Sequence, residues 1–191
     1  MNLSLTKIIN MKKILIFTIL ILVVTGSKAP IITGFLAENS YNVMVEVEDE
    51  RREEQKVHEM TLRVLTVIRQ IESNDRYHVR GLSGEYGAYQ FMPGTWRMYS
   101  RKYFGEVLDV TDPEHQDKVA YYKVRDLIEY GYGLKEIASI WNSGSPRWQG
   151  KIGVNSHNVA YNVPQYVNNF EYIYFNNVVD APLTTTTTFF T

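Results

Sequence analysis

The stretch that decides the fold is Ile71–Trp96, which reads IESNDRYHVRGLSGEYGAYQFMPGTW. Three glycines in it recur at a spacing of three: Gly81, Gly84 and Gly87. Such glycines indicate tight turns, so we expect turns or a small β-hairpin between about Ser83 and Phe91. Glu72 lies where a helical pattern gives way to these turns, and partial burial against apolar residues can raise the pKa of a carboxyl group there. Glu72 is therefore a candidate proton donor.

On both sides of this stretch, apolar residues recur at spacings of three and four, which predicts amphipathic helices. Prolines, glycines and a side-chain cap at Asp112 indicate where these helices begin and end. In chain order they are a helix ending near Glu72, one over Pro93–Phe104, one from Pro113 to before Gly131, one from Leu134 that is stopped by Asn142, Ser143 and Gly144, and one opening at Pro164. The pattern predicts a mainly α domain whose helices pack around one core.

The N-terminal segment has the pattern of a secretory signal. Lys12 and Lys13 precede an apolar run from Ile14 to Val24, and small residues follow it. This run is shorter than the roughly 20 residues of a membrane-spanning helix. We expect residues 1–29 to be a cleaved signal peptide or, alternatively, an uncleaved N-terminal membrane anchor, and the protein to be periplasmic or extracellular.

The rest of the chain divides by composition. Residues 30–45 mix Pro, Gly, Ser and Asn without a sustained period, which predicts a linker. Residues 46–178 hold the helical patterns and begin with an acidic run, as is favourable near a helix start. Residues 179–191 end in a threonine run of low complexity, which predicts a disordered tail.

Charge and cysteine content exclude several classes of function. The formal net charge is −1, but residues 1–29 contain four lysines and no acid, so 16 basic residues face 21 acidic ones beyond them. That acidic balance argues against a nucleic-acid partner, which would require many phosphate contacts. The absence of cysteine excludes a disulfide, a thiolate metal site and a cysteine nucleophile.

The residues around Glu72 resemble the soluble lytic transglycosylase family of the lysozyme-like superfamily. That family has a Glu-Ser pair, a GxxGxxQxMPxT element, a Tyr-Asn-x-Gly element and a late Tyr-Val pair. The matching residues here are Glu72 and Ser73; Gly84, Gly87, Gln90, Met92, Pro93 and Thr95; Trp141, Asn142, Ser143 and Gly144; and Tyr166 and Val167. The resemblance covers about residues 57–175.

The resemblance implies an α+β lysozyme-like fold with an active-site cleft beside the turn region. It also implies cleavage of the β-1,4 bond between N-acetylmuramic acid and N-acetylglucosamine in peptidoglycan strands. By the same resemblance Glu72 is the general acid and then the general base, and the substrate-binding residues are Ser73, Gln90, Trp141, Asn142 and Tyr166. Trp141 departs from the family tyrosine, so a polar role there is open, although an indole can stack on a sugar ring.

The number of acids decides the reaction. A transglycosylase needs one, because the 6-hydroxyl of the muramic acid closes on its own anomeric carbon to give a 1,6-anhydro product. A lysozyme-type muramidase needs a second carboxylate, for which Glu85 is the candidate within the motif, although we expect it to face solvent. A catalytically silent glycan-binding module of a wall-spanning apparatus is the other alternative.

We expect a monomer that needs no cofactor. We also expect no metal site, because the four histidines lie at unrelated spacings.

Overall fold

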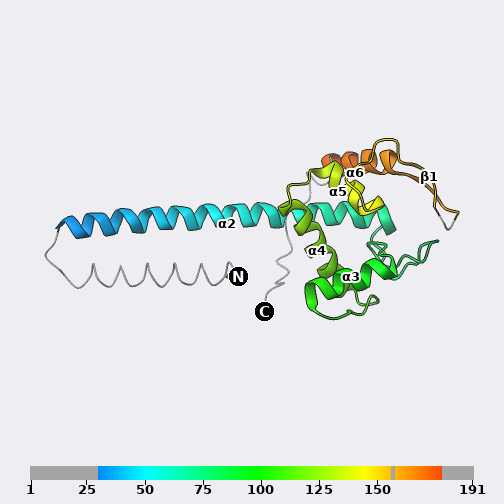
Figure 1. Cartoon of the computed structure of the whole chain (residues 1–191), viewed down its shortest axis with the longest axis horizontal. Coiled ribbons are helices and arrows are strands. Elements are labelled where there is room, and N and C mark those ends of the chain that lie inside the picture. The colour runs from blue at the N-terminus through cyan, green and yellow to red at the C-terminus, as the bar shows by residue number, and fades with distance from the viewer. Residues whose placement is uncertain (1–29, 156–157, 178–191) are drawn as a thin grey trace. The chain divides into compact units, whose positions relative to one another are not determined.

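The computed structural model describes residues 30–155 and 158–177, with side chains from Tyr41 to Asn155 and from Asn158 to Asn176 (Figure 1). The elements are α2 (Pro30–Ser73), α3 (Pro93–Phe104), α4 (Pro113–Glu129), α5 (Leu134–Ser143), β1 (Ile152–Val154), β2 (Ala160–Asn162) and α6 (Val163–Asn177). The expected mainly α class is confirmed, with one small antiparallel sheet among the described residues.

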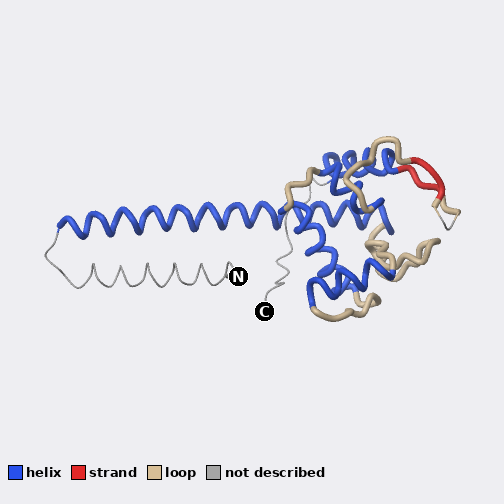
Figure 2. Tube along the Cα trace, in the orientation of Figure 1, coloured by secondary structure: helices blue, strands red, loops and turns tan. Residues whose placement is uncertain are grey.

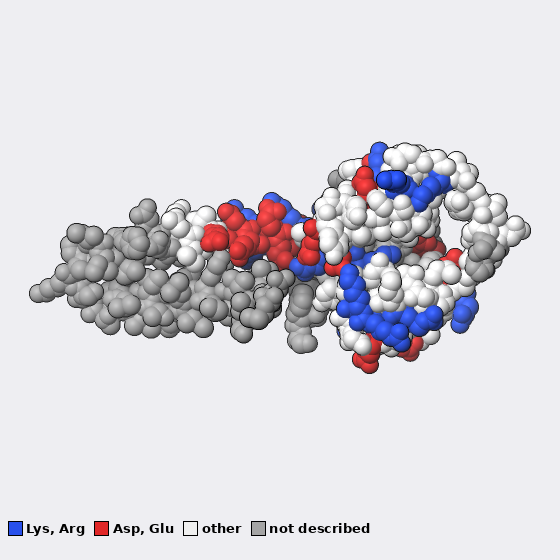
Figure 3. Space-filling model, in the orientation of Figure 1, with Lys and Arg blue, Asp and Glu red and all other residues white. Residues whose placement is uncertain are grey.

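The chain divides into two compact units, and the boundary lies between Lys56 and Val57. In the first unit, acidic side chains gather along α2 (Figure 3). Pairs one turn apart, such as Glu48 with Arg51 and Glu53 with Lys56, neutralise part of this charge. Because these pairs are exposed, each stabilises the helix only slightly.

The segment expected to be a linker is helical. α2 begins at Pro30, so residues 30–45 belong to the same helix as Glu72. Helix propagation costs little once a helix has nucleated, so a segment without an apolar period can continue a neighbouring helix. The compact unit that holds the core starts at Val57, eleven residues after the expected start at residue 46.

The ends of the other helices follow local signals in the sequence. α3 begins at Pro93, and α4 begins at Pro113, after Asp112, whose side chain accepts a hydrogen bond of 2.8 Å from the Glu114 backbone N–H. α5 ends at Ser143 and is capped by Gly144, which has a φ of 73° that glycine adopts without strain. These predicted boundaries are confirmed, and α6 begins one residue before the expected Pro164.

The hydrophobic core lies in the second unit, where α3 packs on α4 and α5 on α6. Each helix contributes residues that are almost fully buried: Val64, Val67 and Ile68 from α2, Trp96 from α3, Val119 and Val124 from α4, Ile137 and Ala138 from α5, and Val167 and Phe170 from α6. The turn region adds Ala88, Tyr89 and Phe91. The turns are therefore packed into the core and held in place by it.

The region expected to form turns or a small β-hairpin forms turns, and the paired strands lie in another segment (Figure 2). Residues 74–92 form turns with two isolated bridges, Arg80 with Tyr86 and Tyr86 with Phe91. β1 pairs with β2 in the segment between α5 and α6, with Gly153 opposite Tyr161. Each strand has only three residues, most of them exposed, which is too few for an alternating pattern to be recognised.

The expected leader at residues 1–29 and the threonine-rich tail at residues 179–191 lie outside the described residues. Within residues 30–155 and 158–177, no helix carries an apolar stretch long enough to span a bilayer.

Candidate active site

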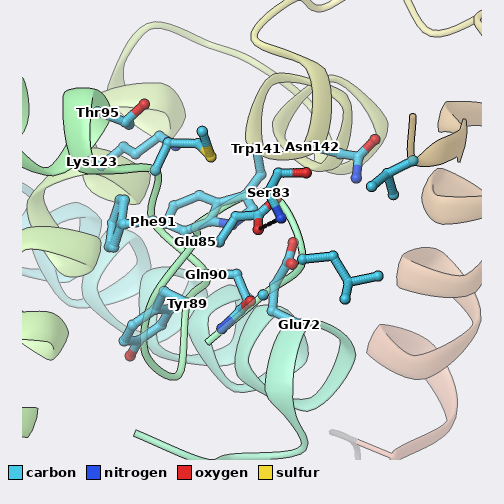
Figure 4. A pocket seen from close by; sticks show the side chains of 14 residues that line it. Glu72, Ser83, Glu85, Tyr89, Gln90, Phe91, Thr95, Lys123, Trp141 and Asn142 are labelled. Atoms are coloured by element: carbon cyan, nitrogen blue, oxygen red, sulfur yellow. Dashed lines mark hydrogen bonds between the residues drawn. The ribbon is translucent and has the colours of Figure 1, made fainter. Parts of the chain in front are cut away.

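A pocket of about 310 Å³ lies between the turn region and α5 (Figure 4). Its lining includes Glu72 from the end of α2, Glu85 and Gln90 from the turn region, Lys123 from α4 and Trp141 from α5. The two carboxyl groups point toward the same part of the pocket from different elements (Figure 4). The pocket lies beside the turn region, and Val159, just before β2, also lines it.

Glu72 is held by a long-range contact. The Tyr166 hydroxyl, on α6, donates a hydrogen bond of 2.7 Å to Oε1 of Glu72. Burial raises the pKa of Glu72 to about 7, although the bond from Tyr166 and the charge of Lys123 act in the opposite direction and the charge of Glu85 adds to the rise. Glu72 can therefore be protonated near neutral pH and can ionise when it gives up that proton.

Ser73 is buried and is not part of the pocket lining. Its side chain is 4% exposed, and its hydroxyl donates to the Ala88 carbonyl at 2.9 Å and accepts from the Arg76 backbone N–H at 3.0 Å. The resemblance implied a contact with sugar, but these bonds instead tie the end of α2 to the turn region. Ser73 thus positions its neighbour Glu72.

Glu85 lines the pocket, whereas the sequence had suggested that it faces solvent. One carboxylate oxygen, Oε2, accepts a hydrogen bond of 2.9 Å from the Ser83 backbone N–H, within its own turn. The same oxygen lies over Gly81, where a Cβ would overlap it. One of the two carboxylate oxygens of Glu85 is therefore already hydrogen-bonded within the turn.

Gln90 and Asn142, the two amide residues expected to bind substrate, both line the pocket but differ in whether their side chains are already hydrogen-bonded. Gln90 has a φ of 48°, and its Nε2 donates to the Gly87 carbonyl at 2.7 Å, so its side chain braces the turn that it belongs to. Asn142 is exposed at the end of α5 and points into the pocket from the opposite side (Figure 4). Asn142 is thus available to a ligand, while the Gln90 nitrogen is already engaged.

Lys123 is a pocket residue that the sequence reasoning missed. Its side chain is 6% exposed, and Nζ lies 3.7 Å from the centroid of the Trp141 ring. Burial lowers the pKa of Lys123 to about 7, while the Glu72 charge raises it. A signal was present, because Lys123 lies between Val119 and Leu127 on the core-facing side of a helix, where lysine is unusual.

Gln116 is a second missed residue, and it fixes the turn region. It is fully buried, and its Oε1 accepts from the Ala88 backbone N–H at 2.8 Å. Its Nε2 donates to the carbonyls of Tyr77 at 3.0 Å and Val110 at 2.8 Å. One side chain of α4 therefore links two loops by three hydrogen bonds.

The neighbouring Asp117 supports the aromatic wall of the pocket. It accepts hydrogen bonds from the hydroxyls of Tyr89 at 2.7 Å and Tyr77 at 2.8 Å, and Arg69 lies 3.5 Å away. Tyr89 in turn contacts the Trp141 ring at a centroid distance of 6.1 Å. The network joins α2, the turn region and α4 behind the pocket.

Within the part of the chain that the structure describes, no group of three or more His, Asp or Glu side chains could hold a metal ion.

Comparison of the chain with protein-family models, with curated proteins and with solved structures found no match.

Proposed function

We propose that this protein is a peptidoglycan-cleaving enzyme of lysozyme-like fold, a lytic transglycosylase in which Glu72 is the catalytic acid. The observation that carries the proposal is the carboxyl group of Glu72 in a pocket, with a pKa raised to about 7 by burial. A glycosidic bond breaks only if its leaving oxygen receives a proton as positive charge develops on the ring carbon. A carboxyl group that remains protonated near neutral pH can supply that proton.

The contact with Tyr166 selects the oxygen that reacts. Because Tyr166 donates to Oε1, the proton of neutral Glu72 resides on Oε2. Oε2 gives this proton to the glycosidic oxygen, and the bond from that oxygen to the anomeric carbon breaks. The 6-hydroxyl oxygen of the same muramic acid then bonds to that carbon, and its proton returns to Glu72. The product is a 1,6-anhydro sugar, and no water is consumed.

The position of Glu85 supports the transglycosylase route over hydrolysis. A hydrolase needs a second carboxylate free to activate water or to attack the sugar. Oε2 of Glu85 is bonded to the Ser83 N–H, so the group is less available for either task. The internal hydroxyl also has a large advantage in effective concentration over water, since it is part of the substrate.

A two-carboxylate muramidase is the second candidate, and one observation favours it. Glu85 lines the same pocket as Glu72, and its charge contributes to the raised pKa of Glu72. The second oxygen of Glu85 could hold a water molecule. This candidate predicts products with a reducing end that disappear when Glu85 is replaced.

Either activity requires access to the cell wall. The lysine-flanked apolar run within residues 1–29 supports export of the protein, by a cleaved leader or as an N-terminally anchored form.

The test is cleavage of purified peptidoglycan by Glu72→Gln, with Glu106→Gln as the control because Glu106 is exposed and outside the pocket lining. The amide keeps the shape of the side chain but has no proton to give. We expect a loss of about 10²-fold to 10⁴-fold in rate, the usual contribution of general acid catalysis. Full activity of Glu72→Gln would show that another group is the acid.

Mass analysis of the products separates the two candidates. We expect 1,6-anhydro ends from the parent protein and from Glu85→Gln, with little change in rate. Reducing ends from the parent that are lost in Glu85→Gln would make the protein a muramidase.

A further inference from the structure

Lys123 is a buried cation without an anionic partner in direct contact. It is 6% exposed, and no oxygen atom of the described residues accepts a hydrogen bond or an ion pair from its Nζ. Burial of a charged group is costly unless it is paired and hydrogen-bonded. A lysine retained in this setting, in the lining of a pocket, indicates that a partner comes from outside the protein.

Aromatic rings hold the ammonium group from the protein side. The Nζ atom lies 3.7 Å from the ring centroid of Trp141, 5.2 Å from that of Tyr99 and 5.5 Å from that of Phe91. Indole gives the strongest cation–π attraction, so Trp141 fixes the ammonium position. Rings do not accept the three N–H bonds of an ammonium group as a carboxylate does, so its donors stay available toward the pocket.

The acids of the pocket leave Lys123 without a charged partner in the state that starts the reaction. Glu72 must be protonated to act as a general acid, and it then carries no charge. Glu85 is bonded to the Ser83 N–H of its own turn. A ligand that brings a carboxylate would therefore meet an unpaired cation in a mostly dry wall, where a charge-assisted hydrogen bond is strong.

We propose that Lys123 is a binding point for a carboxylate group of the substrate, and that it selects anionic glycans over neutral ones. The inference rests on the proposed function, because the ligand is a glycan strand at the Glu72 pocket. Peptidoglycan offers such a group in two places. A stem peptide ends in free carboxylates, and a muramic acid without its peptide exposes the carboxylate of its lactyl group. Strands made only of N-acetylglucosamine offer neither.

The charge state of Lys123 is consistent with this role. Burial lowers its pKa to about 7, so in the free protein the ammonium form is easily lost as the pH rises above neutrality. A bound carboxylate favours the charged form and raises that pKa. Binding of an anionic ligand is therefore coupled to uptake of a proton near neutral pH.

The experiment measures glycan binding in the Glu72→Gln background, where cleavage is expected to be at least about 10²-fold slower, with and without Lys123→Met. Methionine has a similar length and no charge, and replacing a buried charge with an apolar side chain of similar volume is often neutral or stabilising. Thermal unfolding verifies that the variant is folded. Lys135→Met is the matched control, because Lys135 also lies over an indole, that of Trp148 at 5.8 Å, but outside the pocket lining.

Three ligands are compared: peptide-bearing glycan strands, amidase-treated strands with a free lactyl carboxylate, and neutral oligomers of N-acetylglucosamine. We expect Lys123→Met to weaken binding of at least one anionic ligand by about tenfold or more, since a hydrogen bond to a charged group contributes roughly 1.5–3 kcal/mol. The affinity of Lys123→Met for neutral oligomers should lie within twofold of that of the Glu72→Gln protein that keeps Lys123. Lys135→Met should leave the affinity for each ligand unchanged.

The pattern of loss identifies the source of the carboxylate. Loss with peptide-bearing strands alone assigns it to the stem peptide, and loss with amidase-treated strands assigns it to the lactyl group. Equal loss with all three ligands, or no loss with any, would overturn the inference. Failure of the proposed function is a separate result: the parent protein would cleave none of these glycans, while the binding comparison would still test Lys123.

Discussion

At the scale of single residues, the protonation of Glu72 is a balance of opposing effects. Burial favours the neutral acid and raises the pKa, while the hydrogen bond from Tyr166 and the charge of Lys123 favour the carboxylate. Such a balance suits a group that must first donate a proton and then accept one, because neither form is strongly preferred near neutral pH.

Tyr166→Phe tests this balance through the pH profile. Removing the hydroxyl removes a bond that stabilises the ionised form, so the pKa of Glu72 rises. The acid then stays protonated to higher pH, and the basic limb of the activity profile should move to higher pH. We expect the maximal rate to fall by less than about tenfold, because one hydrogen bond is lost.

The control is Tyr172→Phe on the same helix, since Tyr172 is 66% exposed. Its pH profile should match that of the parent. A basic limb that moves to lower pH in Tyr166→Phe would contradict the assigned role of the hydroxyl.

At the scale of elements, the turn region carries one wall of the pocket, and α4 holds it in position. Gly87 lies directly against the Gln116 side chain, with a φ of 85°. A Cβ there would overlap the amide that binds Ala88, Tyr77 and Val110. The close approach, and not only the backbone conformation, therefore requires glycine at this position.

A pair of alanine substitutions separates these two requirements. Gly84 has a φ of 95° but nothing within 4 Å of an added Cβ, so Gly84→Ala carries the conformational cost alone. We expect that cost to be about 1–3 kcal/mol, and Gly87→Ala to lose a further 1–3 kcal/mol or so as buried hydrogen bonds of Gln116 break. Denaturant unfolding measures both. Equal losses would show that the contact with Gln116 adds nothing.

At the scale of the whole molecule, the described core belongs entirely to the unit that starts at Val57. The buried apolar residues run from Val64 to Ile173, and the contact of His58 with the Tyr121 hydroxyl at 2.7 Å lies at the edge of that unit. The first unit contributes no residue to the described core or to the pocket lining. The described residues from Val57 onward therefore contain the whole described core and the pocket lining.

Deletion of residues 1–56 tests this organisation. We expect the shortened protein to unfold cooperatively, with a thermal unfolding midpoint within a few degrees of that of the parent protein. It should also cleave purified peptidoglycan at the parent rate. Deletion of residues 1–63 is the comparison, because it also removes His58 and the buried Thr61. A shortened chain from Val57 that is unfolded or inactive would assign a structural role to the N-terminal part of α2.

The sequence alone determined the features that depend on neighbours along the chain. Pro93, the Asp112 cap and Gly144 set helix ends through interactions within one turn, and those boundaries are the observed ones. The break in periodicity near Glu72 likewise marked the end of α2 and the turn region. Local signals of this kind do not require knowledge of what packs where.

The tertiary structure decided what depends on distant parts of the chain. Tyr166 reaches Glu72 across 94 positions, and Gln116 and Lys123 come to the turn region and pocket from α4. Ser73 bonds to the Ala88 carbonyl and is not part of the pocket lining. Burial, charge and hydrogen bonding set the pKa of Glu72, and each arises from segments brought together only by packing of the core. A motif can therefore name a candidate acid, but only the folded environment raises the pKa of its carboxyl group to about 7.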